Sequence, residues 1–130
     1  MSADYPDDLR YTKEHEWARI RGNLVQVGIT KFAVDQLGDV TQLELPREGE
    51  KVKKDEVFGT VESVKAVSDL FAPVSGVVVK VNTPIHDTPE AVNEDPYDEG
   101  WLIEIEMSDA KQADELMSAA EYREFVAEQG

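Results

Sequence analysis

The sequence predicts a mainly β protein, built as a flattened barrel-sandwich of two small antiparallel sheets with short peripheral helices, including C-terminal helices. Strand-like runs dominate to about residue 106, a helical period follows them, and a Gly-x-Val-x-x-apolar-x-x-Pro pattern occurs twice. The 130 residues suffice for one domain around one core. We expect a single domain over residues 1–130, with its core over about 9–107 and a C-terminal helical segment over about 109–128.

A hairpin is predicted near the N-terminus. Along residues 24–29, apolar side chains alternate with Gln26 and Gly28, which is the period of a strand with one buried face. Residues 15–20 have a similar strand-like composition, and the polar residues 21–23 between the two runs favour a turn.

A short helix follows this hairpin. Thr30 is a favourable N-cap, Leu37 would end the helix, and Gly38 follows where a left-handed residue is favoured. Further strands are predicted over residues 39–45, 56–62, 66–72, 77–82 and 101–107, with a turn at 46–49. The stretch 83–100 carries three prolines, and we expect it to be a long irregular loop.

The C-terminal segment changes to a helical period. Ser108 or Asp109 would cap a helix that runs through about Met117. Ser118 and Glu121 form a capping-box pattern that opens a second helix. One face of this second helix is apolar, with Tyr122, Phe125 and Val126. We expect both helices to pack on the outside of the sheets.

The repeated pattern predicts a symmetric sheet core. Its first copy is Gly38, Val40, Leu43 and Pro46, and its second copy, 38 residues later, is Gly76, Val78, Val81 and Pro84. Two such strand units would pack face to face, each covering the apolar side that the other cannot bury alone.

Composition excludes several classes of function. A net charge of −15 argues against nucleic-acid binding, and it indicates either solubility alone or steering toward basic faces of partner proteins. No run of about 18 apolar residues predicts a membrane span, and the N-terminal segment is acidic where a targeting signal would be basic. We therefore expect a cytoplasmic protein without membrane contact, and we expect it to be a monomer.

The sequence offers little chemistry of its own. It has no cysteine, no glycine-rich nucleotide motif and no Gly-x-Ser-x-Gly nucleophile motif. His15 and His86 lie far apart, and the segment that follows His15 lacks the second histidine of a zinc helix, so no metal site is predicted. Most of the 28 acidic residues are expected on solvated faces, and we expect no catalytic site.

Lys65 lies between two strand-like runs that close around a tight polar turn. From this position alone it is either an ordinary solvated lysine or a handle for modification. An amide formed at this amine would convert the charged side chain into a neutral link to a cargo.

The surrounding residues resemble a known family. Glu62-Ser-Val-Lys65-Ala, followed by Ser68-Asp-Leu-Phe-Ala-Pro73-Val-Ser-Gly76, resembles the lipoyl-lysine hairpin of the glycine cleavage H-protein family, whose fold is that of lipoyl and biotinyl domains. Other stretches are similar to the family in the same order: Tyr11-Thr-Lys-Glu-His-Glu-Trp17, Val27-Gly-Ile-Thr30, Leu37-Gly-Asp-Val40, Leu43-Glu-Leu-Pro46, Val92-Asn93 and Pro96-Tyr-Asp-Glu-Gly-Trp-Leu102. Together they span about residues 9–125, and the ordered set is far more specific than the hairpin motif alone.

The resemblance implies a carrier of the glycine cleavage system, with lipoate joined to Lys65 as N6-lipoyl-lysine. The arm would take an aminomethyl group from a pyridoxal-phosphate glycine decarboxylase to an aminomethyltransferase, and then electrons to a flavin-dependent dihydrolipoyl dehydrogenase. A lipoate ligase or a lipoyl/octanoyl transferase would attach the arm.

The resemblance also implies roles for the residues around Lys65. The tip and the ligase-recognition surface would comprise Glu62, Ser63, Val64, Ala66 and Asp69. A cleft that shelters the loaded arm would use the carboxylates of Glu14, Glu16 and Asp69 to bind its cationic amine. Trp17 and Trp101 are either part of this cleft or part of the core. Three features depart from the pattern: Glu14 stands where the family often has a smaller polar residue, Asp55 lies where many lipoyl and biotinyl domains have glycine, and Val40-Thr-Gln-Leu43 is more polar than usual.

Three alternatives remain at this point. A biotinyl carrier shares the architecture but usually has Met on both sides of the lysine, where this chain has Val64 and Ala66. A lipoyl relay protein, which passes lipoyl groups to other complexes, would keep the same hairpin. An acidic binding module with an unmodified lysine is the third.

Overall fold

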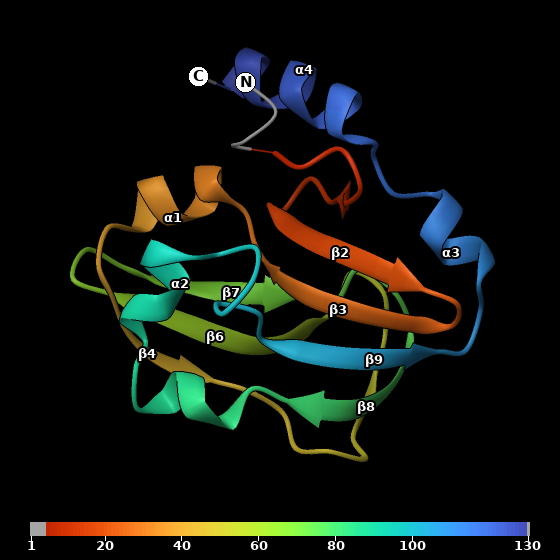
Figure 1. Cartoon of the computed structure of the whole chain (residues 1–130), viewed down its shortest axis with the longest axis horizontal. Coiled ribbons are helices and arrows are strands. Elements are labelled where there is room, and N and C mark those ends of the chain that lie inside the picture. Colours follow the sequence, from red (N-terminus) through yellow and green to blue (C-terminus); the bar gives the residue numbers. More distant parts are fainter. Residues whose placement is uncertain (1–4, 130) are drawn as a thin grey trace.

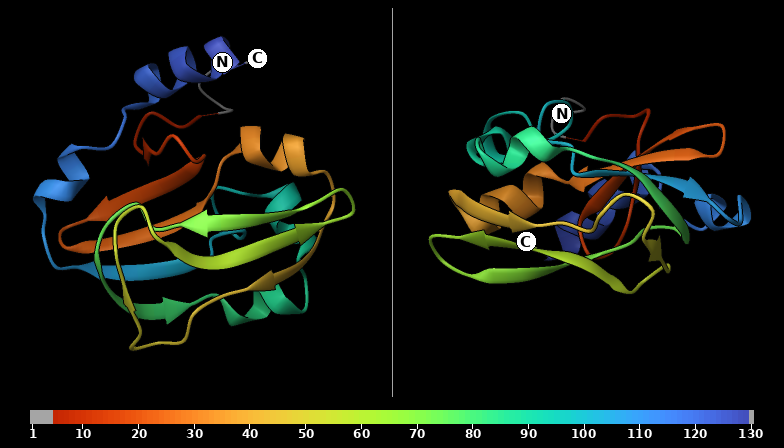
Figure 2. Two further views of the ribbon diagram at one scale, coloured as in Figure 1. Left: turned by 180° about the vertical axis from the view of Figure 1, so that it is seen from behind. Right: turned by 90° about the horizontal axis from the view of Figure 1, so that it is seen from below.

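The computed structural model describes residues 5–129, and its regular structure is mainly β (Figure 1). Two antiparallel sheets form two layers, and the helices lie at the periphery (Figure 2). The predicted fold class is therefore confirmed. Residues 1–4 and 130, which include the start of the acidic N-terminal segment and both ends of the predicted domain, lie outside the described residues.

The larger sheet has six strands in the order β1-β2-β3-β9-β8-β5. They are β1 (Arg10–Tyr11), β2 (Glu16–Arg21), β3 (Leu24–Ile29), β9 (Ile103–Met107), β8 (Gly76–Val81) and β5 (Lys51–Val52). The hairpin predicted near the N-terminus is confirmed, because β2 and β3 pair in antiparallel register. β1 and β5 have two residues each and were not expected from the sequence.

The smaller sheet has three strands in the order β4-β6-β7. They are β4 (Val40–Glu44), β6 (Val57–Ser63) and β7 (Val67–Phe71). β6 and β7 form a hairpin, as the sequence predicts for the segment around Lys65. In the turn before β6, Asp55 has a positive φ of 69°, which explains why this position suits glycine.

One main apolar core lies between the two layers. It takes fully buried side chains from both sheets, among them Val25, Val27, Val61, Leu70, Ile103 and Ile105. Val40 on β4 and Val78 on β8, which are equivalent residues of the sequence repeat, belong to this core from opposite sheets. The repeat therefore corresponds to one strand in each layer, as the sequence analysis expects.

Helix α1 (Lys31–Leu37) follows β3 directly. The hydroxyl oxygen of Thr30 accepts a hydrogen bond from the Ala33 amide at 3.3 Å, and Gly38 ends the helix with a φ of 76°. Both termini are therefore where the sequence predicts them.

The prediction of a long irregular loop over residues 83–100 is wrong. The segment contains a 3₁₀ helix, η1 (Thr83–His86), and a one-turn helix, α2 (Glu90–Glu94). Ile85 and Val92 from these helices are buried in the main core. Their burial stabilises two short helices that local propensity and the neighbouring prolines do not indicate.

Two helices end the chain. Helix α3 (Lys111–Asp114) is shorter than predicted, because Met117 exchanges backbone hydrogen bonds of 2.9 Å in both directions with Tyr11 and is therefore extended. Helix α4 (Ala119–Gln129) begins with the predicted capping box: the Ser118 amide donates to Glu121 at 2.9 Å, and the Glu121 amide donates to Ser118 at 3.2 Å.

Helix α4 packs outside the main core. It forms a second apolar cluster with the N-terminal segment and β2, which contains Leu9, Tyr11, Trp17, Ala119 and Tyr122. In Figure 1, α4 lies above the start of β2, beyond the edge of the two layers. None of the helices in residues 5–129 has the length and apolar character that a bilayer crossing requires.

Candidate functional site

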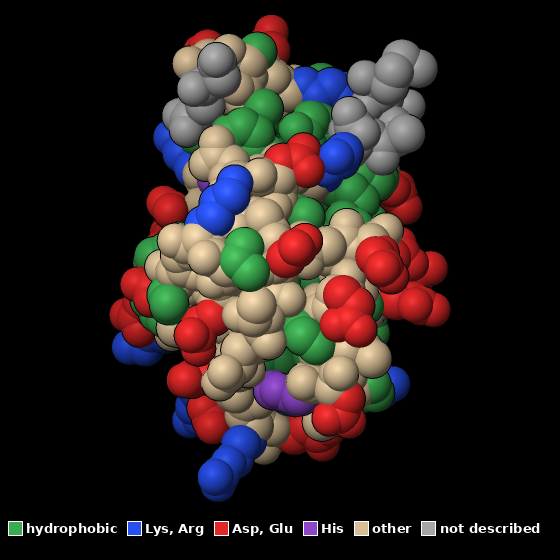
Figure 3. Space-filling view, turned by 90° about the vertical axis from the view of Figure 1, so that its left-hand side faces the viewer, with side chains coloured by type: hydrophobic (Ala, Val, Ile, Leu, Met, Phe, Trp, Pro, Cys, Tyr) green, Lys and Arg blue, Asp and Glu red, His purple; other side chains and the backbone are tan. Residues whose placement is uncertain are grey.

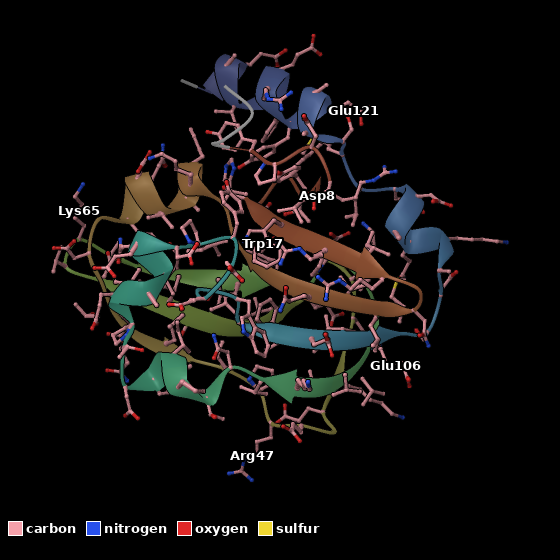
Figure 4. All side chains as sticks on the ribbon, in the orientation of Figure 1. Asp8, Trp17, Arg47, Lys65, Glu106 and Glu121 are labelled. Atoms are coloured by element: carbon pink, nitrogen blue, oxygen red, sulfur yellow. The ribbon has the colours of Figure 1, made fainter. Side chains whose placement is uncertain are left out.

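Lys65 lies at the tip of the β6–β7 hairpin, with its side chain exposed at the outer edge of the molecule (Figure 4). Ser63 closes the turn: its amide donates to the Ala66 carbonyl at 2.8 Å, and its hydroxyl oxygen accepts from the amides of Lys65 and Ala66, both at 3.1 Å. These bonds fix the backbone on both sides of Lys65 while its amine remains accessible. The predicted place of Lys65 at a tight tip is confirmed.

A second backbone segment supports this tip. The Val64 amide donates to the Asp39 carbonyl at 3.0 Å, and the Lys65 side chain lies against Gly38. A Cβ atom added to Gly38 would lie 3.3 Å from Lys65 Cε. Gly38 and Asp39, which follow α1, therefore support the tip, and we call these two residues the seat.

Asn93, on α2, holds the backbone of the seat in place through two hydrogen bonds. Its Nδ2 donates to the Gly38 carbonyl at 2.8 Å, and its Oδ1 accepts from the Val40 amide at 2.8 Å. Asn93 was not predicted to take part in the site. The Val92-Asn93 dipeptide in the family resemblance was the only signal, because the loop was expected to be irregular.

Side chains of contrasting character surround the tip. Val64 and Val67 are large hydrophobic residues with 67% and 65% of their surface exposed. Glu62 on β6 is half-buried, and Asp69 on β7 is exposed. The predicted recognition residues therefore lie around Lys65, and Val67 is an addition that the sequence analysis did not name.

A cleft of about 440 Å³ opens beside the hairpin. Its walls come from the start of β2, from α1 and from β6 and β7. It is lined by the three predicted carboxylates, Glu14, Glu16 and Asp69, by Ala66 of the tip, and by His15. The structure thus brings together the residues of the predicted cleft and joins them to the tip that carries Lys65.

Glu16 is the buried carboxyl of this cleft, with 1% of its surface exposed. Its Oε1 accepts from the Thr12 hydroxyl at 2.7 Å, and its Oε2 accepts from the Phe71 amide at 3.2 Å. Burial raises the pKa of Glu16 to about 8, although these hydrogen bonds act in the opposite direction. A cation that enters the cleft would therefore favour ionisation of this group.

His15 is a cleft residue that the sequence analysis missed, since it considered this side chain only as a metal ligand. Its φ of 73° is unusual for a residue other than glycine and turns the chain between Glu14 and Glu16. Its ring packs against Phe32, with a centroid distance of 4.5 Å, and its Nδ1 lies 2.7 Å from the Tyr122 hydroxyl. Burial lowers the pKa of His15.

The two tryptophans do not line this cleft. Trp17 is fully buried, and its indole Nε1 donates to the Pro96 carbonyl at 2.8 Å (Figure 4). Trp101 packs against the same second cluster. Of the two readings of these residues, the structure supports core packing. Within residues 5–129, no group of three histidine or acidic side chains is arranged to hold a metal ion.

The end of the molecule around Lys65 is predominantly acidic. Figure 3 views the molecule from this side and shows acidic side chains spread over the surface with isolated basic ones between them. Asp35, Asp39, Asp69 and Glu94 are exposed on the elements that surround the tip. The surface combines an accessible amine, two exposed valines and negative charge.

Comparison with known proteins gives consistent matches over nearly the whole chain. The family described as "Glycine cleavage H-protein" matches residues 9–129. A glycine cleavage system H protein from Anaeromyxobacter sp. is 61% identical over 126 residues, which cover 97% of this chain and 98% of the relative. One from Halalkalibacterium halodurans is 53% identical over 127 residues, covering 98% and 99%. The crystal structure of a glycine cleavage system H protein from Mycobacterium marinum is similar, with a TM-score of 0.85 and 42% identity over 96% of this chain and 98% of that chain.

Proposed function

The chain belongs to the glycine cleavage H-protein family, and we therefore propose that Lys65 bears a lipoyl group in amide linkage. Membership of this family makes the chain a lipoyl carrier of the glycine cleavage system. The observation that best supports Lys65 as the attachment point is its exposed position on a tight hairpin tip, directly beside an acidic cleft.

The residues around Lys65 fit an amide-linked arm. Ala66, directly after Lys65, and Ser63, at the base of the turn, are small, and Val64 offers a modifying enzyme an exposed apolar contact. Ala66 also lines the cleft, so an arm that starts at Lys65 has a short route into the cavity. The other walls of the cleft include Leu70 and Phe71, which are suitable contacts for an apolar chain.

The lipoyl group would supply a dithiolane, the sulfur chemistry that a chain without cysteine lacks. The contribution of this chain is to bind and shelter the cationic amine of the aminomethyl cargo. We assign this task to Glu16 and Asp69, with Glu14 at the entrance of the same cleft. Because Glu16 is buried and already fixed by Thr12 and Phe71, its carboxyl group is positioned before a cargo enters, and the cation would favour its ionisation.

In this function the chain is a non-catalytic subunit, and other proteins carry out the reactions. The partners that we propose are the pyridoxal-phosphate glycine decarboxylase, the aminomethyltransferase, the dihydrolipoyl dehydrogenase, and a lipoate ligase or lipoyl/octanoyl transferase. The tip residues Glu62, Val64 and Asp69 would contact the attaching enzyme. The acidic end that surrounds Lys65 would steer the carrier toward basic faces of these partners. A monomer in the cytoplasm remains the prediction from the sequence.

Intact-mass measurement tests the attachment point. Cells supplied with lipoate should yield a protein heavier by one lipoyl group, and Lys65→Ala and Lys65→Arg should both lack this addition, because a guanidinium offers no free amine for acylation. Lys80→Arg is the control, since Lys80 is also exposed but lies on β8. A lipoyl addition that persists in Lys65→Ala would refute the assignment.

Reconstitution separates the glycine cleavage role from a pure relay role. The lipoylated chain should support release of carbon dioxide from glycine by the decarboxylase. A chain that passes lipoyl groups to other complexes but does not serve the decarboxylase would instead be a relay protein.

A further inference from the structure

A chain of hydrogen bonds links helix α4 to the wall of the cleft. His15 Nδ1 lies 2.7 Å from the Tyr122 hydroxyl, and the same hydroxyl lies 2.7 Å from Thr30 Oγ1. Tyr122 and Thr30 are fully buried, and His15 lines the cleft. The binding of a cargo by the carboxylates of the cleft does not involve this network of hydrogen bonds. The network therefore needs an explanation of its own.

The positions of the protons follow from the requirement that buried polar groups find partners. Thr30 Oγ1 already accepts from the Ala33 amide, so it still needs an acceptor for its own proton. Among the described residues, the Tyr122 oxygen is the acceptor to which Thr30 is hydrogen-bonded. Thr30 therefore donates to Tyr122. The reverse direction would leave the proton of a fully buried hydroxyl without a partner.

The proton of Tyr122 then points to His15. The Tyr122 hydroxyl accepts from Thr30 and donates to Nδ1 of the imidazole. A ring nitrogen that accepts a hydrogen bond carries no proton, so His15 is neutral and its proton is on Nε2. Burial acts in the same direction, because it disfavours the charged imidazolium.

The other groups that face His15 give this charge state a consequence. Glu14 and Glu16 flank it in sequence, and Asp69 lines the same cleft from β7. Helix α1 contributes Phe32 to the ring contact and only uncharged residues to the cleft, Ala33, Gln36 and Leu37, and α4 contributes Tyr122 and Phe125. His15 is the only basic group among the described residues that line the cleft.

We propose that Thr30 and Tyr122 hold His15 as a neutral imidazole, protonated on Nε2, so that the wall of the cleft presents no positive charge to a cationic cargo. The proposal rests on the proposed function, because that function supplies the cation. An imidazolium would repel an ammonium group in the same cavity. By keeping His15 neutral, the hydrogen bonds from Thr30 and Tyr122 remove this repulsion and favour binding of the cargo. They also give helix α4, which lies outside the main core, a role in the cleft.

Two phenol-to-phenyl substitutions test the proposal under matched conditions. The rings of Tyr122 and Tyr11 are stacked with a centroid distance of 4.6 Å in the same cluster. Tyr122→Phe removes the hydroxyl that reaches His15, whereas Tyr11→Phe removes one that donates to the Pro6 carbonyl at 2.7 Å. Both variants keep the aromatic packing, so Tyr11→Phe controls for loss of a hydroxyl from this stack.

The first measurement uses the unmodified chain and does not depend on lipoate. The ¹⁵N chemical shifts of the imidazole should show neutral, Nε2-protonated His15 in the wild type and in Tyr11→Phe at pH 6.5. In Tyr122→Phe, His15 should become protonated at a higher pH than in the wild type, because Nδ1 no longer accepts a hydrogen bond from Tyr122. A wild-type His15 that is charged at this pH, or that carries its proton on Nδ1, would overturn the proposal.

The second measurement is the lifetime of the loaded carrier. Hydrolysis of the aminomethyl thioether consumes one water and returns the thiol, formaldehyde and ammonium, so release of formaldehyde reports exposure of the cargo. At pH 6, Tyr122→Phe should release formaldehyde about three- to tenfold faster than wild type, and at pH 8 the two rates should converge. Tyr11→Phe should match wild type at both pH values. Equal rates for the two variants at pH 6 would refute the proposal.

A second pair of variants covers the case in which Tyr122→Phe does not fold. Thr30→Val removes the hydroxyl that starts the chain of bonds, and Thr30→Ser retains it. Thr30→Ser should behave like the wild type. Thr30→Val removes the donor that directs the Tyr122 proton toward His15, so the imidazolium should appear at a higher pH than in Thr30→Ser; equal pH profiles of the two variants would count against the proposal. If Lys65 never accepted lipoate, the proposed function would fail, while the tautomer of the unmodified chain would still decide the assignment of His15.

Discussion

Asn93 and Gly38 are joined by a hydrogen bond of 2.8 Å, from the side-chain amide of α2 to the carbonyl at the end of α1. The same side chain accepts from the Val40 amide, so it holds the backbone on both sides of Asp39. Asp39 in turn accepts from the Val64 amide at the hairpin tip. The position of Lys65 is thus linked through backbone contacts to a helix that is distant in sequence.

Replacement of Asn93 with Ala should therefore slow lipoylation as well as weaken the fold. Two hydrogen bonds are lost and two partly buried backbone groups are left unpaired, which should lower the free energy of unfolding by about 1–3 kcal/mol. Because Asp39 is then less well held, the kcat/KM of a lipoate ligase for the unmodified chain should fall. Urea unfolding and a lipoylation time course measure the two effects.

Asn82→Ala is the matched control for Asn93→Ala. Asn82 also bridges backbone carbonyls, those of Glu99 at 2.9 Å and Trp101 at 2.6 Å, but both bonds join it to the segment before β9 and not to the tip or its seat. It should lose a similar amount of stability and keep the wild-type rate of lipoylation. If both variants were lipoylated equally slowly, loss of stability alone would explain the effect.

Gly38→Ala should be destabilising because of the backbone. The φ of 76° and ψ of −153° at Gly38 belong to a region that only glycine adopts readily, so alanine should cost about 1–3 kcal/mol. The new Cβ would also approach Lys65 Cε, although a flexible side chain can move away. Gly22→Ala is the comparison, since Gly22 also has a positive φ, 63°, but has no atom within 4 Å of an added Cβ. Only Gly38→Ala should reduce lipoylation beyond its effect on unfolding.

The elements that sequence patterns predicted correctly are those that local chemistry determines. The alternation along β3, the Thr30 N-cap and the Ser118–Glu121 capping box each depend on residues close together in the chain. The two-residue strand β5 depends on pairing with the distant β8, Tyr11 of β1 also pairs with Met117 near the other end of the chain, and α2 depends on burial of Val92. No local pattern contains that information.

The site divides in the same way. The tip, Lys65 and the carboxylates of the cleft were predicted through the family resemblance, and the structure places them together. The roles of His15 and Asn93 were missed, because each depends on contact with a residue far along the chain: Tyr122 lies 107 positions from His15, and Gly38 lies 55 positions from Asn93. The positive φ of His15 also could not be predicted from the residue type, because histidine rarely adopts this conformation.

Glu16 should make the stability of the fold depend on pH. Its pKa rises from an ordinary carboxyl value in the unfolded chain to about 8 in the folded one, so the folded state binds more protons between these values. The contribution of this group to stability is therefore fully present below about pH 4.5 and is lost as the pH rises through 8. Relative to Glu16→Gln, the wild type should lose about 2–4 kcal/mol over this range, as measured by urea unfolding at a series of pH values.

The comparison with Glu16→Gln removes the general effect of charge, because both proteins keep the remaining acidic residues. Glu121→Gln serves as a second control. It lies on the surface, and the hydrogen bonds from Ser118 lower its pKa, so its contribution to stability has the opposite pH dependence. A wild type and a Glu16→Gln variant with parallel pH profiles would show that the Glu16 carboxyl is not perturbed.

The carboxylates of the cleft should differ in their importance for the lifetime of the loaded carrier. Glu16→Gln keeps the shape of the buried side chain but removes its charge, and Asp69→Asn does the same on β7. Each should accelerate release of formaldehyde at pH 8, by about tenfold for Glu16 because charge-assisted hydrogen bonds are strongest away from water. Asp69→Asn and Glu14→Gln should have smaller effects than Glu16→Gln, since both side chains are exposed and water screens their charges. Glu106→Gln, on β9 and outside the cleft, is the control and should leave the lifetime unchanged. If Glu16→Gln and Asp69→Asn released formaldehyde at the wild-type rate, the assignment of the cleft to the cargo would be wrong.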